Sequence, residues 1–187
     1  IDRRGNYIFQ YNGNLTHLGL LKEINLGKLN NNEVSKKILA IQRDLARDKG
    51  YGPGSSLDKR VRHIQHIRNS TFRVAYKRNG NLNIERSFNF VRFNSRILSM
   101  SRVPDNSEIR KRWLIKIIGD KPNSDLIKAL ERVGTKANGR FRILTDAEVV
   151  RHNADSFYQT GTSVVYVWKI NSLTRTPPDL IFKLQIQ

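Results

Sequence analysis

The densest group of residues that could do chemistry lies between residues 59 and 68. Its basic side chains are Lys59, Arg60, Arg62 and Arg68, and two histidines stand among them. Lys and Arg neutralise phosphate groups, and the release of bound counterions then drives association without regard to base sequence. The cluster therefore predicts contact with a polyanion.

The charge of the whole chain supports this interpretation. The sequence has 34 Lys and Arg against 16 Asp and Glu, a net charge of +18, and residues 58–113 hold fourteen of the basic and four of the acidic side chains. Such an excess favours nucleic acid as a partner. A merely solubilising basic surface and an anionic membrane surface remain alternatives. The predicted nucleic-acid-binding residues are Arg3, Arg4, Lys59, Arg60, Arg62, Arg68, Arg73, Lys77 and Arg78.

Two histidines, His63 and His66, have a spacing that invites a metal site. A zinc site needs further His, Cys or carboxylate ligands, and no acidic residue or third ligand of clear spacing accompanies them. A basic arm that contacts phosphate is the preferred interpretation. We expect no metal and no cofactor.

The competing chemistry is that of a basic nuclease, which needs a carboxylate cluster for a metal ion or a histidine base. No candidate group has the spacing of a recognised nuclease motif, so we expect no catalytic residue and no enzyme. The candidate groups are Asp146 with Glu148 and His152, Asp105 with Glu108 and Lys111, and Asp179 with Lys183.

Composition limits the architecture that can position these residues. A chain of 187 residues with 38% hydrophobic content can bury one good core, and without Cys it has no disulfide and no thiolate metal site. No apolar run approaches the roughly 20 residues of a membrane span. The start at Ile1 has no signal-peptide core, and we expect a processed or trimmed N-terminus.

Residues 1–56 are predicted to form an N-terminal arm, a helix and a glycine-rich linker. A stripe of Val34, Ile38, Ile41 and Leu45 indicates an amphipathic helix, with Asn32 as its N-cap. Lys49 and Gly50 should end it, and residues 51–56 are the linker. Residues 15–29 are compatible with either a short helix or an extended arm.

Residues 57–187 are predicted to form a mainly β, eight-stranded antiparallel jelly-roll sandwich. The strand pattern by itself suggests an antiparallel sandwich, a jelly roll or a barrel. Between residues 88 and 120, two apolar runs alternate at period two, and Trp113, Ile115 and Ile117 share one face of the second run. The strands should carry arginines on the face that does not enter the core. Further strands are predicted at 71–78, 140–144, 162–170 and 180–187, with a hairpin turn at residues 79–81. Residues 57–70 suit a short helix or an irregular arm, and residues 123–134 a helix or a broken strand.

The order of these runs resembles that of a known protein family. VRFNSRILSM is followed by WLIKIIGDKP, the compact strand RFRILTD, the apolar strand SVVYVWKI and the terminal strand LIFKLQIQ. Over residues 70–187 this order is similar to the single jelly-roll capsid proteins of small single-stranded DNA plant viruses and of satellite viruses. That family usually has a strongly Arg-rich N-terminal arm, whereas this chain has Arg3, Arg4 and the cluster at 59–68.

The resemblance implies a coat protein that self-assembles into an icosahedral shell and binds the packaged single-stranded nucleic acid through a basic arm and inner face. Its partners would be further copies of itself and nucleic acid, with no membrane. It would occur in the virion, and in the host nucleus or cytoplasm during assembly. A nuclease and a non-capsid nucleic-acid-binding viral protein, such as a movement or matrix protein, remain the alternatives. Tyr51, Tyr76 and Trp113 could stack on bases, although core packing is the preferred role of Trp113 and of Trp168.

Overall fold

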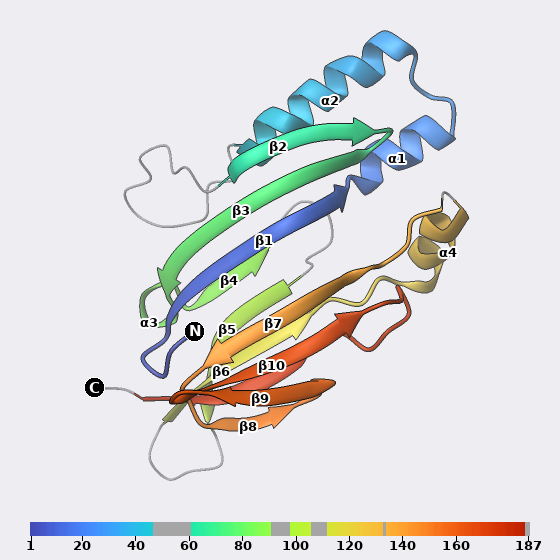
Figure 1. The fold of residues 1–187 in the computed structure, drawn as a ribbon. Helices are drawn as coiled ribbons and strands as arrows, with labels where there is room; N and C mark the ends of the chain where they lie inside the picture. Colours follow the sequence, from blue (N-terminus) through green and yellow to red (C-terminus); the bar gives the residue numbers. More distant parts are fainter. Residues whose placement is uncertain (47–60, 91–97, 106–111, 133, 186–187) are drawn as a thin grey trace. The chain divides into compact units, whose positions relative to one another are not determined.

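The computed structural model describes residues 1–46, 61–90, 98–105, 112–132 and 134–185 (Figure 1). The chain divides into two compact units. The smaller unit is Ile8–Asn79, and the larger unit combines Ile1–Tyr7 with Gly80–Gln187. The sequence predicts a boundary after residue 56, and the structure instead joins the segments on both sides of residues 51–56 in one unit, because their strands share a sheet.

The smaller unit contains most of a three-stranded sheet of order β1-β3-β2, built from β1 (Asn6–Thr16), β2 (Val61–Arg68) and β3 (Thr71–Asn81). Alternate residues of β3 are buried, with Phe72 0% and Val74 3% exposed. The prediction of a helix or irregular arm at residues 57–70 is wrong for the described part, because β2 pairs antiparallel with β3. The three-residue spacing of its apolar side chains was misleading, since backbone pairing with β3 determines the conformation.

The helices of the smaller unit are α1 (Leu18–Asn25) and α2 (Asn31–Ala46). The predicted helix is confirmed as α2, but its N-cap is Asn30 and not Asn32. The Asn30 side-chain oxygen accepts from the Glu33 backbone N–H at 3.0 Å, and the Glu33 carboxylate accepts from the Asn30 N–H at 2.8 Å. This reciprocal pair satisfies two N–H groups of the first turn. The predicted end of the helix and the linker lie outside the described residues, as does the side chain of Leu45.

The predicted hairpin turn at residues 79–81 is wrong. β3 continues through Gly80 to Asn81, which caps the short helix α3 (Leu82–Glu85), and the turn between β2 and β3 lies at Asn69 instead. A side chain at position 80 would meet the carboxylate of Glu85 and the hydroxyl of Tyr7. Glycine at this position therefore allows the side chains of Glu85 and Tyr7 to lie close to the backbone, and it does not form a turn.

The larger unit holds two antiparallel sheets and the helix α4 (Ser124–Arg132). One sheet has the order β4-β5-β6-β11-β8 and the other the order β7-β10-β9 (Figure 1). The bounds of the strands are β4 Ser87–Phe90, β5 Leu98–Asp105, β6 Arg112–Gly119, β7 Gly139–Thr145, β8 Val149–His152, β9 Ser156–Thr160, β10 Ser163–Ile170 and β11 Asp179–Leu184. The mainly β, antiparallel class is thus confirmed and is consistent with a sandwich, although the described chain has eleven strands in all.

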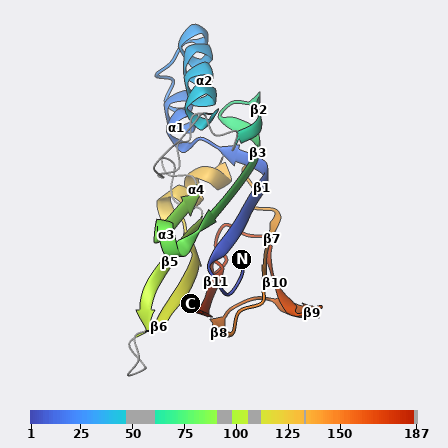
Figure 2. The same ribbon diagram turned by 90° about the vertical axis from the view of Figure 1, so that its left-hand side faces the viewer.

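The core of the larger unit lies between these sheets, which Figure 2 shows from a second direction. Ile115 of β6, Phe182 of β11 and Trp168 of β10 have no exposed surface. The Trp168 indole N–H donates to the Asn153 side-chain oxygen at 2.7 Å, so the buried ring leaves no polar group unsatisfied. The predicted alternation of β6 and the core position of Trp168 are both confirmed.

One open prediction is also decided. Residues 123–134 contain the helix α4, and the Asn123 side-chain oxygen accepts from the Leu126 N–H at 2.8 Å near its start. The predicted strands at 140–144, 162–170 and 180–187 correspond to β7, β10 and β11, while β8 and β9 were not foreseen. No helix among the described residues is both long and apolar enough to cross a membrane.

Candidate nucleic-acid interface

The predicted binding residues fall in several places. Lys59 and Arg60 lie outside the described residues, as does the side chain of Arg62. Arg78 belongs to the buried face of β3 and is only 6% exposed. A side chain with so little accessible surface has little to offer a phosphate group, so Arg78 is a poor candidate for this role.

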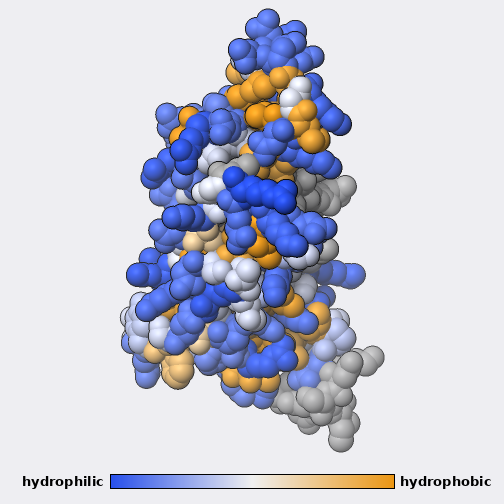
Figure 3. Space-filling view, turned by 90° about the vertical axis from the view of Figure 1, so that its right-hand side faces the viewer, coloured by the Kyte–Doolittle hydropathy of each residue, from blue (hydrophilic) through white to orange (hydrophobic). Residues whose placement is uncertain are grey.

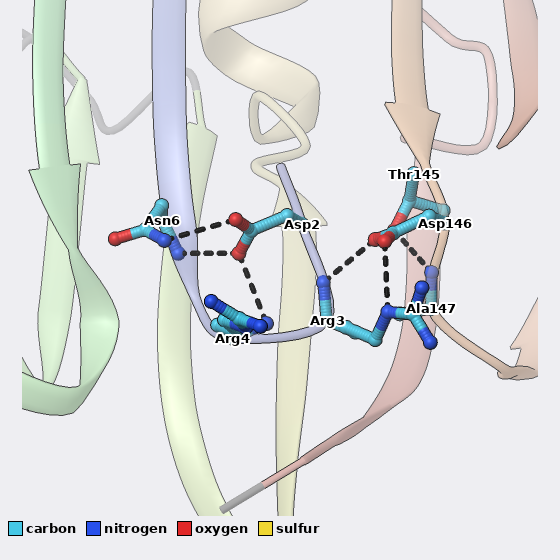
Figure 4. Close-up of polar contacts among 7 residues, drawn as sticks. All are labelled: Asp2, Arg3, Arg4, Asn6, Thr145, Asp146 and Ala147. Carbon is cyan, nitrogen blue, oxygen red and sulfur yellow. Dashed lines mark hydrogen bonds and ion pairs between the residues drawn. The ribbon is translucent and has the colours of Figure 1, made fainter. Parts of the chain in front are cut away.

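Arg3 and Arg4 precede β1 in the larger unit, where Figure 4 shows their contacts. The backbone N–H of Arg3 donates to Asp146 Oδ1 at 2.8 Å, and its Nε donates to Oδ2 at 2.9 Å. Burial tends to raise the pKa of Asp146, but the hydrogen bonds from Arg3 outweigh it and hold that pKa below its ordinary value. Arg3 is therefore engaged in a structural ion pair, while the side chain of Arg4 is exposed.

Three other predicted residues lie on the solvent-facing side of the smaller unit's sheet. Arg73 and Lys77 alternate with the buried residues of β3, and Arg68 is exposed at the end of β2 opposite Thr71. Across the strands, Gln65 lies opposite Arg73 and His63 opposite Ala75.

Three of the carboxylates proposed for a nuclease each pair with a different cation. Asp146 pairs with Arg3, Glu148 with Lys183 at 2.8 Å, and Asp179 with Arg151 at 2.8 Å. Glu108 and Lys111 lie outside the described residues, and Asp105 is 8% exposed.

His152, the candidate base, is packed between aromatic rings. Its ring lies 4.7 Å from that of Tyr166 and 5.5 Å from that of Phe157, between centroids. Its Nδ1 accepts from the Ala154 N–H at 3.2 Å. Within the described part of the chain, no three His, Cys, Asp or Glu residues gather in a way that could hold a metal ion.

The sequence-based prediction missed a group of cations on the sheet β7-β10-β9. Arg140 of β7 lies directly opposite Lys169 of β10, and Arg142 follows two residues along β7 on the same side. All three side chains are exposed, and they make no hydrogen bond or ion pair within the described residues. We call Arg140, Arg142 and Lys169 the basic face. Like charges directly opposite one another destabilise a sheet unless an anion neutralises them.

An exposed aromatic ring lies on the same side of this sheet as the basic face. Val165 of β10 is opposite both Leu144 of β7 and Tyr158 of β9, and it is only 9% exposed beneath them. Leu144 and Tyr158 are 50% and 52% exposed. Opposite residues of antiparallel strands share a face, and the row of Val165 is four residues along β10 from Lys169, or about 14 Å. The sheet therefore presents cations and an aromatic ring together.

One carboxylate, Asp155, is bonded to the backbone of a basic-face residue. Asp155 accepts from the Lys169 backbone N–H at 2.7 Å and pairs with the side chain of Arg175. The backbone hydrogen bond from Lys169 and then the hydrogen bond from Arg175 lower the pKa of Asp155. This carboxylate therefore has its hydrogen-bond partners in the Lys169 backbone and Arg175, and the charge of Lys169 also contributes to lowering its pKa.

The aromatic residues proposed from the sequence are less suited to stacking than Tyr158. Tyr51 lies outside the described residues, and Tyr76 is 5% exposed. Trp113 is half-buried, with the Arg102 guanidinium 4.4 Å from its ring centroid. The alternation R-F-R at residues 140–142 was the available signal for the basic face. The strand register that adds Lys169 and Tyr158 could not be read from the sequence.

Hydrophilic side chains cover most of the face in Figure 3, and hydrophobic ones form separate small groups there.

The chain matches no protein-family model, no curated protein and no solved structure.

Proposed function

We propose that this protein is a coat protein that associates with further copies of itself and binds single-stranded nucleic acid without base specificity. The observation that carries the proposal is the basic face, where Arg140, Arg142 and Lys169 are exposed and lie next to one another across two strands. Phosphate binding would relieve the repulsion between Arg140 and Lys169, and it would release counterions from the nucleic acid.

The exposed ring of Tyr158 favours a single strand over a duplex. Bases of a single strand are free to stack on an aromatic side chain, whereas paired bases are stacked on one another. Tyr158 lies on the side of the sheet that carries the cations, so one bound segment can reach both. A positive surface with an aromatic platform is the combination that sequence-independent single-strand binders use.

The strand pairings support the jelly-roll form of the proposal. A jelly roll arises when a long antiparallel hairpin rolls up on itself, so that outer strands pair with each other and inner strands likewise. Here β6 pairs with β11 and β7 with β10, both antiparallel, and β9 and β10 form a hairpin. The successive strands β6, β7, β8 and β9 alternate between the two sheets.

The proposal is tested by measuring particle size with light scattering, and the ultraviolet absorbance ratio, before and after nuclease and high salt. Large uniform particles that protect nucleic acid from nuclease are the expected result. A small complex that sheds nucleic acid in high salt would replace the coat protein by a non-capsid binding module. Cleavage of nucleic acid with divalent metal, lost in Asp146→Asn and Glu148→Gln, would replace it by the nuclease.

A further inference from the structure

The strand β9 differs from the other strands whose side chains are fully described. It lies at the edge of the sheet β7-β10-β9, and each of its five residues is exposed. Phe157 and Tyr158 are 62% and 52% exposed, and they point to opposite sides of the sheet because they are adjacent. Among the described strands, β9 therefore has one backbone edge without a partner strand, and it carries an aromatic ring on each side.

Sheet edges are usually protected against pairing by charged residues, proline or bulges. The opposite edge strand, β7, carries Arg140 and Arg142, and the edge strand β8 of the other sheet carries Arg151. The sequence of β9, Ser156-Phe157-Tyr158-Gln159-Thr160, has no charge and no proline. The uncharged edges β1 and β4 differ from it, since each has two buried residues, Tyr7 and Leu15 in β1 and Phe88 and Phe90 in β4.

We propose that β9 pairs antiparallel with β9 of a second copy of this chain. This inference rests on the self-association in the proposed function and assigns it a surface. A net charge of +18 makes two copies repel each other over most of their surface. An uncharged strand is where two such molecules approach with the least electrostatic penalty, which favours a second copy with its own uncharged strand.

The strand is also complementary to itself about a two-fold axis through Tyr158. When two copies of β9 pair antiparallel about this axis, Tyr158 lies opposite Tyr158 of the second copy. Phe157 then lies opposite Gln159, and Ser156 lies opposite Thr160. All five residues are paired, and any register centred on another residue of β9 pairs fewer of them. The interface is isologous and closes as a dimer.

The pairing joins two three-stranded sheets into one continuous sheet of order β7-β10-β9-β9-β10-β7. Opposite residues of an antiparallel pair lie on the same side, so the two copies of Tyr158 are adjacent. The two basic faces then lie on the same side of the joined sheet. A single strand of nucleic acid can cross from one copy to the other without changing sides.

The absence of Cys from the chain allows a direct test by cross-linking. Directly opposite residues have Cα atoms about 4.5–5.5 Å apart, within the range that a disulfide spans. Tyr158→Cys should therefore form a disulfide dimer under mild oxidation. Phe157→Cys and Gln159→Cys should not do so alone, but an equal mixture of these two variants should form a mixed dimer. Asn171→Cys, in an exposed loop, measures random collision.

The second test adds an edge charge and measures the mass of nucleic-acid-free protein by light scattering in high salt. The unaltered chain should be at least dimeric, and both Gln159→Lys and Gln159→Glu should weaken its self-association tenfold or more. Asn171→Lys should leave the mass unchanged. Circular dichroism and the melting temperature show whether each variant folds.

The outcomes separate this inference from the proposed function. A chain that binds nucleic acid but stays monomeric at every concentration overturns the inference. A dimer whose mass is the same in the unaltered chain and in both Gln159 variants also overturns it. So does a Tyr158→Cys variant that cross-links no more than Asn171→Cys. A dimer that cross-links as expected but binds no nucleic acid supports the inference and removes nucleic-acid binding from the proposed function.

Discussion

The solvent-facing sides of the sheets β1-β3-β2 and β7-β10-β9 carry cations in different surroundings. On β3, Arg73 and Lys77 are four residues apart, and Gln65 and His63 lie opposite their strand. On β7 and β10, Arg140 and Lys169 are direct neighbours across the strands. Three cations are present in each group, so the arrangement distinguishes the two surfaces more than the number of charges does.

This difference shows why a count of charges along the sequence is a poor guide to a binding surface. Residues 58–113 hold the largest basic excess, yet Arg78 is buried there and Lys77 is half-buried. Residues 114–187 have a smaller excess, but strand pairing brings exposed cations together. The potential that a phosphate experiences depends on that spacing in three dimensions.

The largest expected effect concerns the cores beneath the two sheets. Phe72→Ala and Trp168→Ala each remove a ring that has no exposed surface, and each should lower the free energy of unfolding of its own unit by about 3–5 kcal/mol. Hydrogen exchange should lose protection in residues 8–79 for the first variant and in the larger unit for the second. Val150→Ala, at a 55% exposed position, is the control. Loss of protection throughout the chain in both variants would show that the units unfold together.

The next effect tests stacking on the basic face. Tyr158→Ala should weaken binding of a labelled single-stranded oligonucleotide by about 1–3 kcal/mol for each base that the ring holds. Because no charge is removed, the dependence of affinity on salt should stay the same. Fluorescence anisotropy at several salt concentrations measures both quantities. Tyr158→Phe, which keeps the ring, should bind like the unaltered chain, and a loss of affinity there would argue against stacking.

The comparison of the two surfaces is tested most directly by paired neutralisations. The salt slope is the steepness with which the logarithm of the binding constant falls as the logarithm of the salt concentration rises. Arg140→Gln with Arg142→Gln should reduce this slope by about 1.4, since each phosphate contact on a single strand contributes about 0.7. Arg73→Gln with Lys77→Gln should lower it by about 0.7, because Arg73 is exposed while Lys77 is half-buried. Equal slopes for the two double variants would mean that the surfaces contribute alike, against our interpretation.

The smallest effect concerns the ion pair of Arg3 and Asp146. The pKa of Asp146 is lowered in the folded chain, so the pair stabilises the fold above the unfolded pKa and loses this contribution as the pH falls through the folded pKa. Asp146→Asn should therefore reduce stability by less than about 1 kcal/mol at neutral pH and by nothing in acid. Denaturant melts at both pH values provide the measurement. A difference that persists in acid would assign the effect to the lost hydrogen bonds.

Local patterns in the sequence were sufficient for some elements and insufficient for others. The alternation of Trp113, Ile115 and Ile117 predicted β6, where Ile115 and Ile117 are buried. The apolar stripe of Val34, Ile38 and Ile41 predicted α2, where all three side chains are half-buried. The cap of α2 was misplaced by two residues, since three consecutive asparagines compete for it and only Asn30 has its partner at Glu33.

Elements that depend on distant partners were missed. β2 has apolar residues at helical spacing and becomes a strand only through pairing with β3. β9 has no buried residue, so residues 156–160 lack the alternation of apolar and polar side chains that predicts a strand. For the same reason the candidate site could be predicted only in its charge. The neighbourhood of Arg140 and Lys169 depends on the register between β7 and β10.

The division of the larger unit between the two ends of the chain has a consequence for the order of folding. The Gln185 N–H donates to the carbonyl of Arg3 at 2.8 Å, so residues from opposite ends of the described chain complete one unit. The smaller unit is continuous in sequence, from Ile8 to Asn79. On the ribosome it can therefore form early, while the first residues wait for β11 to be synthesised. Contacts of such long range form slowly. The nascent chain then has a folded segment between residues 1–7 and the part after residue 79, which have still to pair.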